Sequence, residues 1–289
     1  MTVESHHQGI YVATLNTHWG NALRSGGLEQ LWQGAAQPDA PMAVSRPDIL
    51  LLQEVTDSRE ELATGLESAG FRLAHHAGNL GLAIAVRNDG SAPVEVAGSE
   101  RTRTFKEYGR VESRLAKRSP DREHHMSAHG MIALKFVRGG HEFTVATTRI
   151  AVPFKPLARR RQLRRMQGEI GNEYYDGFFV LGGDMNMSRR HRVDTKMHRR
   201  TGLEAVDLGD EPTWRVAGSK AERYYRAAQR VRGLLRRLPT DLSTYDRQLD
   251  AVLSRGGLRP VPDATRVVDV AGTDHRLVEA KFTFPQGAS

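Results

Sequence analysis

The strongest constraint on the fold is a pair of strand-like runs that are apolar without interruption, in a chain whose other segments carry helical patterns. Residues 49–52 read ILLL and residues 178–181 read FFVL. Continuous runs of this kind are typical of strands that are covered on both faces. A helix is expected after the first run, because Ser58 and Glu61 predict a capping box and Gly70 predicts a C-terminal cap. Strands that alternate with helices predict an α/β domain.

Weaker patterns predict the remaining elements and the limits of this domain. The further strands are expected at residues 10–15, 71–74, 80–87, 131–137, 143–148, 251–254, 265–270 and 277–284, and the further helices at residues 21–33 and 156–170. The sequence contains no internal repeat and no linker. Residues 10–284 are therefore expected to form a single domain, between a flexible N-terminus (1–9) and a tail (285–289).

Two segments of this domain are expected to be insertions. Residues 99–128 are polar, rich in both charges and without a clear period, which predicts a long loop or irregular insertion. Residues 219–238 instead carry one apolar helical stripe surrounded by arginines, and Pro239 stops the pattern. The second segment is interpreted as a basic helical insertion.

Composition limits the chemistry and the partners that are open to the chain. The absence of cysteine excludes disulfides, thiolate metal sites and cysteine nucleophiles. No apolar run is long enough to cross a bilayer and no signal peptide is recognisable, so we expect a cytoplasmic monomer without a transmembrane segment. The net charge of +8 is concentrated in residues 155–165, 189–200 and 220–237, while the rest of the chain is mildly acidic. Concentrated basic segments favour a polyanionic partner, although solvated helix faces give the same pattern.

Polar side chains suited to a hard metal ion lie directly beyond the ends of the expected strands. They are Asn16, Glu54, Asp184, Asn186, Asp274 and His275, and Asp250 opens the strand in QLDAVL. Loops at strand ends are where rigid scaffolds place catalytic groups. Carboxylate and amide oxygens suit Mg²⁺ or Mn²⁺ as the cofactor. Asp246 is an alternative to Asp250, which we favour because an apolar strand follows it directly.

Taken together, the strings TLN, LLLQEV, GGDMN, QLDAVL and TDH resemble the endonuclease/exonuclease/phosphatase superfamily, the fold of deoxyribonuclease I and exonuclease III. Any one string is weak, but here all of them stand in the family order between residues 14 and 275. The resemblance implies an α/β fold, a four-layer sandwich of two packed mixed β-sheets flanked by helices. It also implies hydrolysis of a phosphoester bond by in-line attack of water on phosphorus.

The resemblance assigns metal-binding roles to three residues. Glu54 would be the principal metal ligand, with Asn16 beside it and Asp274 as a further metal contact. The metal ion would act as a Lewis acid and as a template for the substrate phosphate. The number of metal ions, one or two, stays open.

Catalytic roles follow from the same resemblance. Asp184 would position or deprotonate the attacking water, and Asn186 would orient the phosphate or Asp184. Asp250 would support the site through hydrogen bonds or a second metal ion. His275, held by Asp274, would donate a hydrogen bond to a phosphoryl oxygen as negative charge builds there.

The strand VATTRI departs from the family pattern, because many members carry a histidine where this chain has Arg149. Arginine cannot relay a proton at neutral pH, but it can hold phosphate oxygens bidentately. Arg149 is thus expected to act on the substrate phosphate, with a structural arginine as the alternative. Proton transfer to the leaving group would then need another group.

Substrate contacts are expected from one aromatic residue and from the basic segments. Trp214 lies in EPTWR, where relatives often carry an aromatic residue beside the site, and both base stacking and a core position are open to it. The basic residues that we expect to bind substrate are Arg159, Arg189, Arg190 and Arg223.

A nuclease of low sequence specificity is the leading hypothesis, because a long polyanion can use all the basic segments at once. DNA is favoured over RNA as the partner. The alternative is a phosphatase or phosphodiesterase of lipid head groups or other small phosphoesters, with residues 219–238 lying on an anionic membrane. A nucleic-acid-binding module with weak catalysis is the third hypothesis, and the complete set of polar strand-end residues argues against it.

Overall fold

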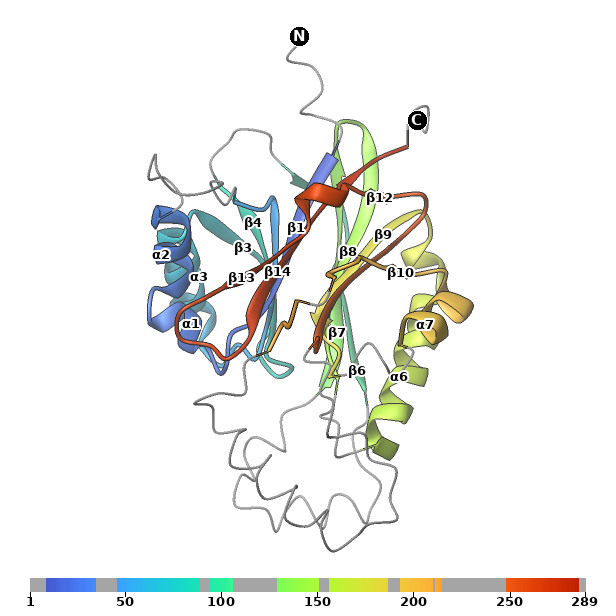
Figure 1. Ribbon diagram of the computed structural model, residues 1–289, viewed down its shortest axis with the longest axis horizontal. Helices are drawn as coiled ribbons and strands as arrows, with labels where there is room; N and C mark the ends of the chain where they lie inside the picture. The colour runs from blue at the N-terminus through green and yellow to red at the C-terminus, as the bar shows by residue number, and fades with distance from the viewer. Residues whose placement is uncertain are drawn as a thin grey trace, which may run out of the picture.

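Two mixed β-sheets packed face to face form the centre of the molecule, and helices cover the outer face of each (Figure 1). The structure is a computed structural model that describes residues 9–34, 46–88, 94–105, 129–150, 156–186, 193–209, 211–214 and 248–285. Within these residues each sheet has seven strands. The four-layer α/β sandwich expected from the sequence is confirmed.

The first sheet has the strand order β12-β14-β1-β2-β4-β3, with β13 also paired to β14. Its strands are β1 (Gly9–Asn16), β2 (Ile49–Gln53), β3 (Phe71–Ala77), β4 (Leu82–Arg87), β12 (Arg259–Pro260), β13 (Arg266–Asp269) and β14 (Arg276–Thr283). β1 is parallel to β2 and antiparallel to β14. The helices α1 (Asn21–Arg24), α2 (Gly27–Gly34) and α3 (Arg59–Ser68) lie on the outer side of this sheet (Figure 1).

The second sheet has the order β10-β11-β9-β8-β7-β5, with β6 also paired to β7. Its strands are β5 (Glu95–Val96), β6 (Arg101–Phe105), β7 (His129–Arg138), β8 (His141–Arg149), β9 (Phe178–Asp184), β10 (Glu204–Ala205) and β11 (Asp250–Arg255). β8 and β9 are parallel, and β11 runs antiparallel to β9. The helices α6 (Pro156–Ile170) and α7 (Val193–Thr201) lie outside it, and two 3-10 turns span Glu173–Tyr175 and Pro262–Ala264.

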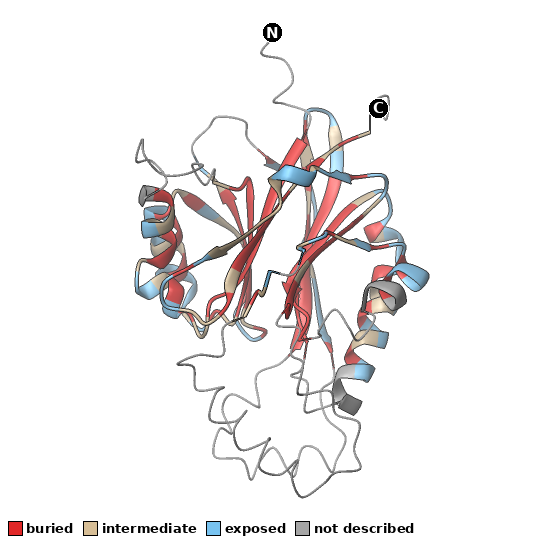
Figure 2. Ribbon diagram, in the orientation of Figure 1, coloured by how far each residue is buried: buried red, intermediate tan, exposed pale blue. Residues whose placement is uncertain are grey.

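Side chains of successive strand residues point to opposite faces, and this alternation builds three apolar layers. In β1, Ile10 and Val12 belong to the layer between the sheets, whereas Ala13 and Leu15 pack under α1–α3. A third layer, which includes Met166 of α6, lies between the second sheet and its helices. Because both faces of the central strands are covered, strands such as β1, β2 and β9 are buried almost throughout, whereas the edge strands β5 and β12 and the outer sides of the helices are exposed (Figure 2).

The helix signals read from the sequence are largely confirmed. Ser58 Oγ accepts a hydrogen bond from the Glu61 backbone N, and Glu61 Oε2 accepts one from the Ser58 backbone N, so the capping box is present. Gly70 follows the helix with a φ of 83°, as its position past the C-terminus requires. The helix expected at residues 21–33 is instead divided into α1 and α2, because Gly26 adopts a φ of 66°.

The polar segment at residues 99–128 is not irregular throughout. Residues 101–105 (RTRTF) form strand β6, paired with β7. The short alternation with β-branched threonines was the strand signal, and the density of charge obscured it. Residues 106–128, the expected basic helix at 219–238 and most of each terminus lie outside the described residues. No helix in the described part of the chain has the length and apolar character needed to cross a membrane.

The sheets approach each other closely at Gly182 of β9, and this contact gives a testable expectation for stability. A Cβ at Gly182 would lie 2.6 Å from Leu51 Cδ1 and 3.1 Å from Thr14 Cβ. We expect Gly182→Ala to lower the free energy of unfolding by about 1–3 kcal/mol, because extra atoms in a packed core displace their neighbours.

Gly168, on the exposed side of α6, is the control for Gly182→Ala, because a Cβ there meets nothing within 4 Å. Gly168→Ala is expected to raise the free energy of unfolding by about 0.5–1 kcal/mol, because alanine favours a helix more than glycine does. Urea unfolding measures both, and equal effects would contradict the expectation.

Candidate active site

Polar residues gather at one end of the sandwich, where β1, β2 and β9 finish and β11 begins. The parallel register of β1 and β2 brings Asn16 level with Gln53, directly before Glu54. On the second sheet, Asp184 pairs with Asp250 across the β9–β11 ladder and with Arg149 at the end of β8. The sheet topology therefore brings together residues that are far apart in the sequence.

Asn16 links the two sheets through its side-chain amide. Asn16 Nδ2 donates hydrogen bonds to Glu54 Oε1 and to Asp184 Oδ2, each at 3.0 Å. Asn186 also donates to Asp184, from its backbone N and from Nδ2, both at 2.9 Å. The buried Asn16 amide thus donates to one carboxylate from each sheet, Glu54 from the first and Asp184 from the second.

Backbone strain is concentrated at the same place. Among the described residues, those other than glycine with a positive φ are His18, Trp19, Glu54 and Asn186, at 50°, 61°, 56° and 45°. Such conformations persist only when the surroundings fix them, and they cluster at functional sites. At Glu54 and Asn186 the positive φ turns the backbone away from the strand direction, just where the side chain of each residue joins the polar cluster.

Asp250 and His275 form a buried pair that joins the two sheets. Asp250 Oδ2 accepts a hydrogen bond from His275 Nδ1 at 2.8 Å. Burial alone would lower the pKa of His275, but the charge and hydrogen bond of Asp250, together with the charges of Asp184 and Asp274, outweigh burial and raise that pKa to about 10. Thr213 supports the pair, because its Oγ1 accepts from the backbone N of Asp250 and its carbonyl accepts from the backbone N of Arg276.

Asp274 has different partners from those expected. The sequence suggested that Asp274 holds His275, but Asp250 does so. Instead, Asp274 Oδ1 accepts from His18 Nδ1 at 2.7 Å and Oδ2 accepts from Trp214 Nε1 at 3.1 Å. The reason is geometric: His275 forms a bridge with Trp214, and neighbouring residues in an extended segment point to opposite sides. Burial favours a raised pKa for Asp274, but the hydrogen bond from His18 and the charge of His275 lower it.

Arg149 contacts Glu54 directly, with Nη2 2.7 Å from Oε1. Its guanidinium also lies against the Trp19 ring, at 5.3 Å from the ring centroid. Burial would raise the pKa of Glu54, but the Arg149 charge and the hydrogen bond from Asn16 hold it below the ordinary value. Asp184 differs: burial and the charges of Asp250 and Glu54 raise its pKa to about 7, against the lowering effect of His275 and Arg149.

The donor set fits a hard divalent cation that keeps part of its water shell. Among the described residues, no three His, Cys, Asp or Glu side chains converge as metal ligands. Mg²⁺ does not need such a cage, because it binds through one or two carboxylates together with water and substrate phosphate. Glu54 and Asp184 supply carboxylates that face one amide. In addition, the buried Oδ1 of Asp250 has no hydrogen-bond partner within the described part of the chain.

The structure brings together nine residues named from the sequence: Asn16, Glu54, Arg149, Asp184, Asn186, Trp214, Asp250, Asp274 and His275. Arg189, Arg190, Arg223 and Asp246 lie outside the described residues, and for Arg159 only the backbone position in α6 is described. Sequence reasoning missed His18, Trp19 and Thr213. His18 and Trp19 lie just beyond the TLN string, and Thr213 precedes Trp214 in EPTWR, so all three stood next to residues that the sequence had already marked.

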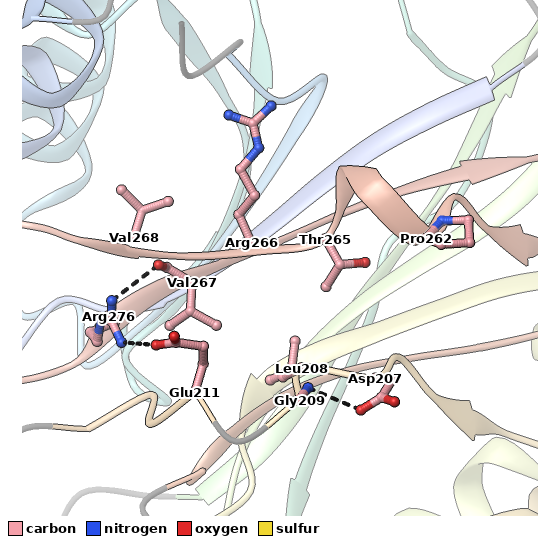
Figure 3. A pocket seen from close by; sticks show the side chains of 10 residues that line it. All are labelled: Asp207, Leu208, Gly209, Glu211, Pro262, Thr265, Arg266, Val267, Val268 and Arg276. Carbon is pink, nitrogen blue, oxygen red and sulfur yellow. Dashed lines mark hydrogen bonds and ion pairs between the residues drawn. The ribbon is translucent and has the colours of Figure 1, made fainter. Parts of the chain in front are cut away.

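A separate cavity of about 500 Å³ opens beside the site, between β13 and the segment after β10. Its wall consists of Asp207, Leu208, Gly209, Glu211, Pro262, Thr265, Arg266, Val267, Val268 and Arg276 (Figure 3). Arg276 closes one end, where it donates to Glu211 Oε2 and to the Val267 carbonyl (Figure 3). None of the residues predicted to be catalytic lines this cavity.

Two mixed sheets with helices outside, and a carboxylate and amide cluster at one end, define a protein of the deoxyribonuclease I-like class. The family model described as Endonuclease/Exonuclease/phosphatase family matches residues 13–275, and the chain belongs to that family. Its members are hydrolases of phosphoester bonds that typically use divalent metal ions. Comparison with curated protein sequences gives no match.

Solved structures with the same fold come from enzymes of several kinds. An endonuclease/exonuclease/phosphatase from Bacteroides vulgatus has a TM-score of 0.59 at 16% identity, over 96% of this chain and 99% of that one. D. rerio TDP2 with a single-strand DNA product has a TM-score of 0.58 at 12% identity, over 96% and 99%. The inositol polyphosphate 5-phosphatase domain of a synaptojanin, with inositol (1,4)-bisphosphate and calcium, has 0.55 at 14%, over 96% and 84%. At these identities the likeness is one of fold.

Proposed function

We propose that this protein is a Mg²⁺-dependent nuclease of low sequence specificity that acts on DNA in preference to RNA. The observation that carries the proposal is the pair of carboxylates, Glu54 and Asp184, held by one Asn16 amide beside the Asp250–His275 pair. This arrangement offers a base, a cationic donor and metal-binding oxygens within one buried cluster. In-line hydrolysis of a phosphodiester needs those three functions.

In this proposal Asp184 orients the attacking water and accepts its proton. Its pKa of about 7 suits a general base at neutral pH. Asn186 fixes the carboxylate through two hydrogen bonds, so that its lone pairs keep their direction. His275 stays protonated beside Asp250 and donates a hydrogen bond to a phosphoryl oxygen as negative charge develops there.

Glu54 is the principal candidate for holding the metal ion, with Asn16 and Asp184 beside it and Asp274 within the same cluster. A bound divalent ion supplies Lewis acidity and neutralises charge on the phosphate. In this proposal Trp214, which donates to Asp274, contacts the substrate next to the side chains that hold the metal ion. Mn²⁺ is expected to replace Mg²⁺, because both prefer oxygen ligands.

The preference for a nucleic acid rests on the exposed arginines of α6. Arg160, Arg161, Arg164 and Arg165 are all exposed, and we call them the α6 arginine face. α6 follows β8, whose last residue is Arg149 of the site, after only a short connection. A long polyanion can contact this face and the site together, whereas a small phosphoester cannot. D. rerio TDP2, which has a similar fold, was solved in complex with a single-strand DNA product, and this is compatible with a nucleic acid as the substrate here.

The experiment compares labelled single-stranded DNA, RNA, supercoiled plasmid and a phosphoinositide, each in Mg²⁺ and in EDTA, with Asp184→Ala as the inactive variant. We expect Mg²⁺-dependent cleavage of DNA that the variant lacks. Cleavage of the phosphoinositide alone would replace the nuclease with the alternative, a phosphatase of lipid head groups. A folded protein that cleaves none of the four substrates would refute the proposal.

Substituting the α6 arginine face by glutamine separates polyanion binding from chemistry. We expect the KM for DNA to rise about 10-fold or more at 150 mM salt, with a weaker salt dependence, because fewer counterions are released on binding. Hydrolysis of bis(p-nitrophenyl) phosphate is expected to be unchanged. Arg59, Arg72, Arg103 and Arg259 are four exposed arginines on other elements, and their replacement by glutamine is the matched control. An equal effect of both sets would show that only net charge matters.

A further inference from the structure

Arg149 lies inside the candidate site, and its position there suggests more than a contact to substrate. Its guanidinium Nη2 is 2.7 Å from Glu54 Oε1, and the exposed fractions of the two side chains are 8% and 12%. Asn16 Nδ2 donates to the same oxygen of Glu54. One carboxylate oxygen of Glu54, the principal candidate for a metal ligand, is therefore already in contact with a positive charge.

The ring of Trp19 covers the other side of this ion pair. The guanidinium carbon lies 5.3 Å from the ring centroid, a distance typical of a cation–π contact. Trp19 is held by its carbonyl oxygen, which accepts from Thr56 Oγ1 at 2.9 Å. Its φ of 61° shows that the surroundings impose its conformation. Arg149 is thus enclosed between an aromatic face and a carboxylate.

The charges of the cluster explain why an arginine is tolerated at this depth. Glu54, Asp184, Asp250 and Asp274 bring four carboxyl groups to one end of the sandwich. An ionised carboxylate that is buried needs a counter-charge, and without one it would take up a proton. Arg149 supplies that charge at Glu54, as His275 supplies it at Asp250.

We propose that the Arg149 guanidinium occupies the cation position at Glu54 when no metal ion is bound, competes with the divalent ion for Glu54 Oε1, and leaves that oxygen when the ion binds. The inference rests on the proposed function only in taking Glu54 as a metal ligand. Its consequence is a site that stays assembled without metal and binds the ion less tightly than its carboxylates alone would. The displaced guanidinium keeps its charge and its planar donors beside the phosphate position.

The first test measures metal affinity by calorimetric titration with Mg²⁺ and Mn²⁺, in the absence of substrate. Arg149→Gln is expected to tighten binding by about 10- to 100-fold, the range over which groups adjacent to metal ligands change affinity. Arg149→Lys, which keeps the charge, is expected to lie between this variant and the wild type. Arg103→Gln is the control for net charge, because Arg103 pairs with Glu169 and not with Glu54, and it is expected to change affinity less than about two-fold.

The second test asks whether the guanidinium moves. Mg²⁺ binding is expected to change the fluorescence of Trp19, because the cation leaves its ring, and Trp19→Phe is expected to remove that change while retaining metal binding. An unchanged or weakened metal affinity in Arg149→Gln would overturn the proposal, as would Mg²⁺ binding that leaves Trp19 emission unaltered. Metal binding by Arg149→Gln, with none detected for the wild type, would support the proposal. Neither test uses a nucleic acid, so failure of the nuclease proposal would leave these results interpretable.

Discussion

At pH 8, Asp184→Asn is expected to lower the rate of phosphodiester hydrolysis at saturating substrate by about 10²- to 10⁴-fold. Asparagine has nearly the same shape but cannot accept a proton from water. Asp184 is buried, and it is fixed by hydrogen bonds from Asn16 and Asn186. The loss should therefore appear in kcat rather than in substrate binding. Cleavage of a labelled single-stranded oligonucleotide, with its binding measured separately in Ca²⁺, distinguishes the two.

The same substitution is expected to preserve or raise stability, which separates a catalytic role from a structural one. The folded protein raises the pKa of Asp184 from its ordinary 3.8 to about 7, mainly through burial. Between these values the folded state binds more protons than the unfolded state, so this group makes the protein less stable as the pH rises from 4 to 7. Asparagine has no such charge to bury. In EDTA at pH 8, Asp184→Asn is expected to leave the free energy of unfolding unchanged or slightly higher, because the loss of the buried charge offsets the amide donor of Asn16 or Asn186 that loses its acceptor.

Asp176→Asn is the matched control, because Asp176 is an exposed carboxylate near the start of the same strand, β9. We expect it to change neither the rate nor the pH dependence of unfolding. An Asp184→Asn protein that is inactive but also unstable at pH 8 would indicate a structural role for this carboxylate. An Asp184→Asn protein with full activity would exclude it as the base.

The sequence patterns predicted an α/β domain and most of the residues that gather at its end, and the resemblance to a known family added the sandwich of two sheets. The reason is local: continuous apolar runs such as ILLL at 49–52 need cover on both faces, and the polar residue that follows each run must lie at a sheet end. Asn16, Glu54 and Asp184 each lie at the end of a strand. Whether they come close together then depends on the order of the strands in the two sheets. The resemblance to a known family supplied that order.

The pairing of side chains within the cluster could not be predicted in this way. His275 was expected to rely on its neighbour Asp274, yet it pairs with Asp250 from the other sheet. Asp274 is bound to His18, which follows a different strand. Such partners depend on side-chain directions and on the distance between two packed sheets, and neither is encoded by spacing along the chain. The ion pair of Arg149 with Glu54 was missed for the same reason.

The Asp250–His275 pair leads to the second large expected effect: Asp250→Asn should lower the hydrolysis rate at pH 7.5 by about 10²- to 10³-fold. Burial lowers the pKa of His275, and the charge of Asp250 is the main factor that raises it to about 10. With that charge removed, burial is opposed mainly by the charges of Asp184 and Asp274, and we expect the pKa of His275 to fall well below its wild-type value. The imidazole then loses its proton at a lower pH than in the wild type, and the cationic donor to the phosphoryl oxygen is weakened at pH 7.5.

The pH profile tests this cause more sharply than the rate does. In the wild type His275 remains protonated until the pH approaches 10, so activity should not decline between pH 8 and 9. In Asp250→Asn the remaining activity should begin to decline at a lower pH than in the wild type, because the protonated form of His275 is then lost at a lower pH. Asp263→Asn, which alters an exposed carboxylate outside the cluster, should keep the wild-type profile. A uniform loss of activity at every pH in Asp250→Asn would mean that Asp250 positions His275 without controlling its charge, because only a change in the pKa of His275 can shift the alkaline limit.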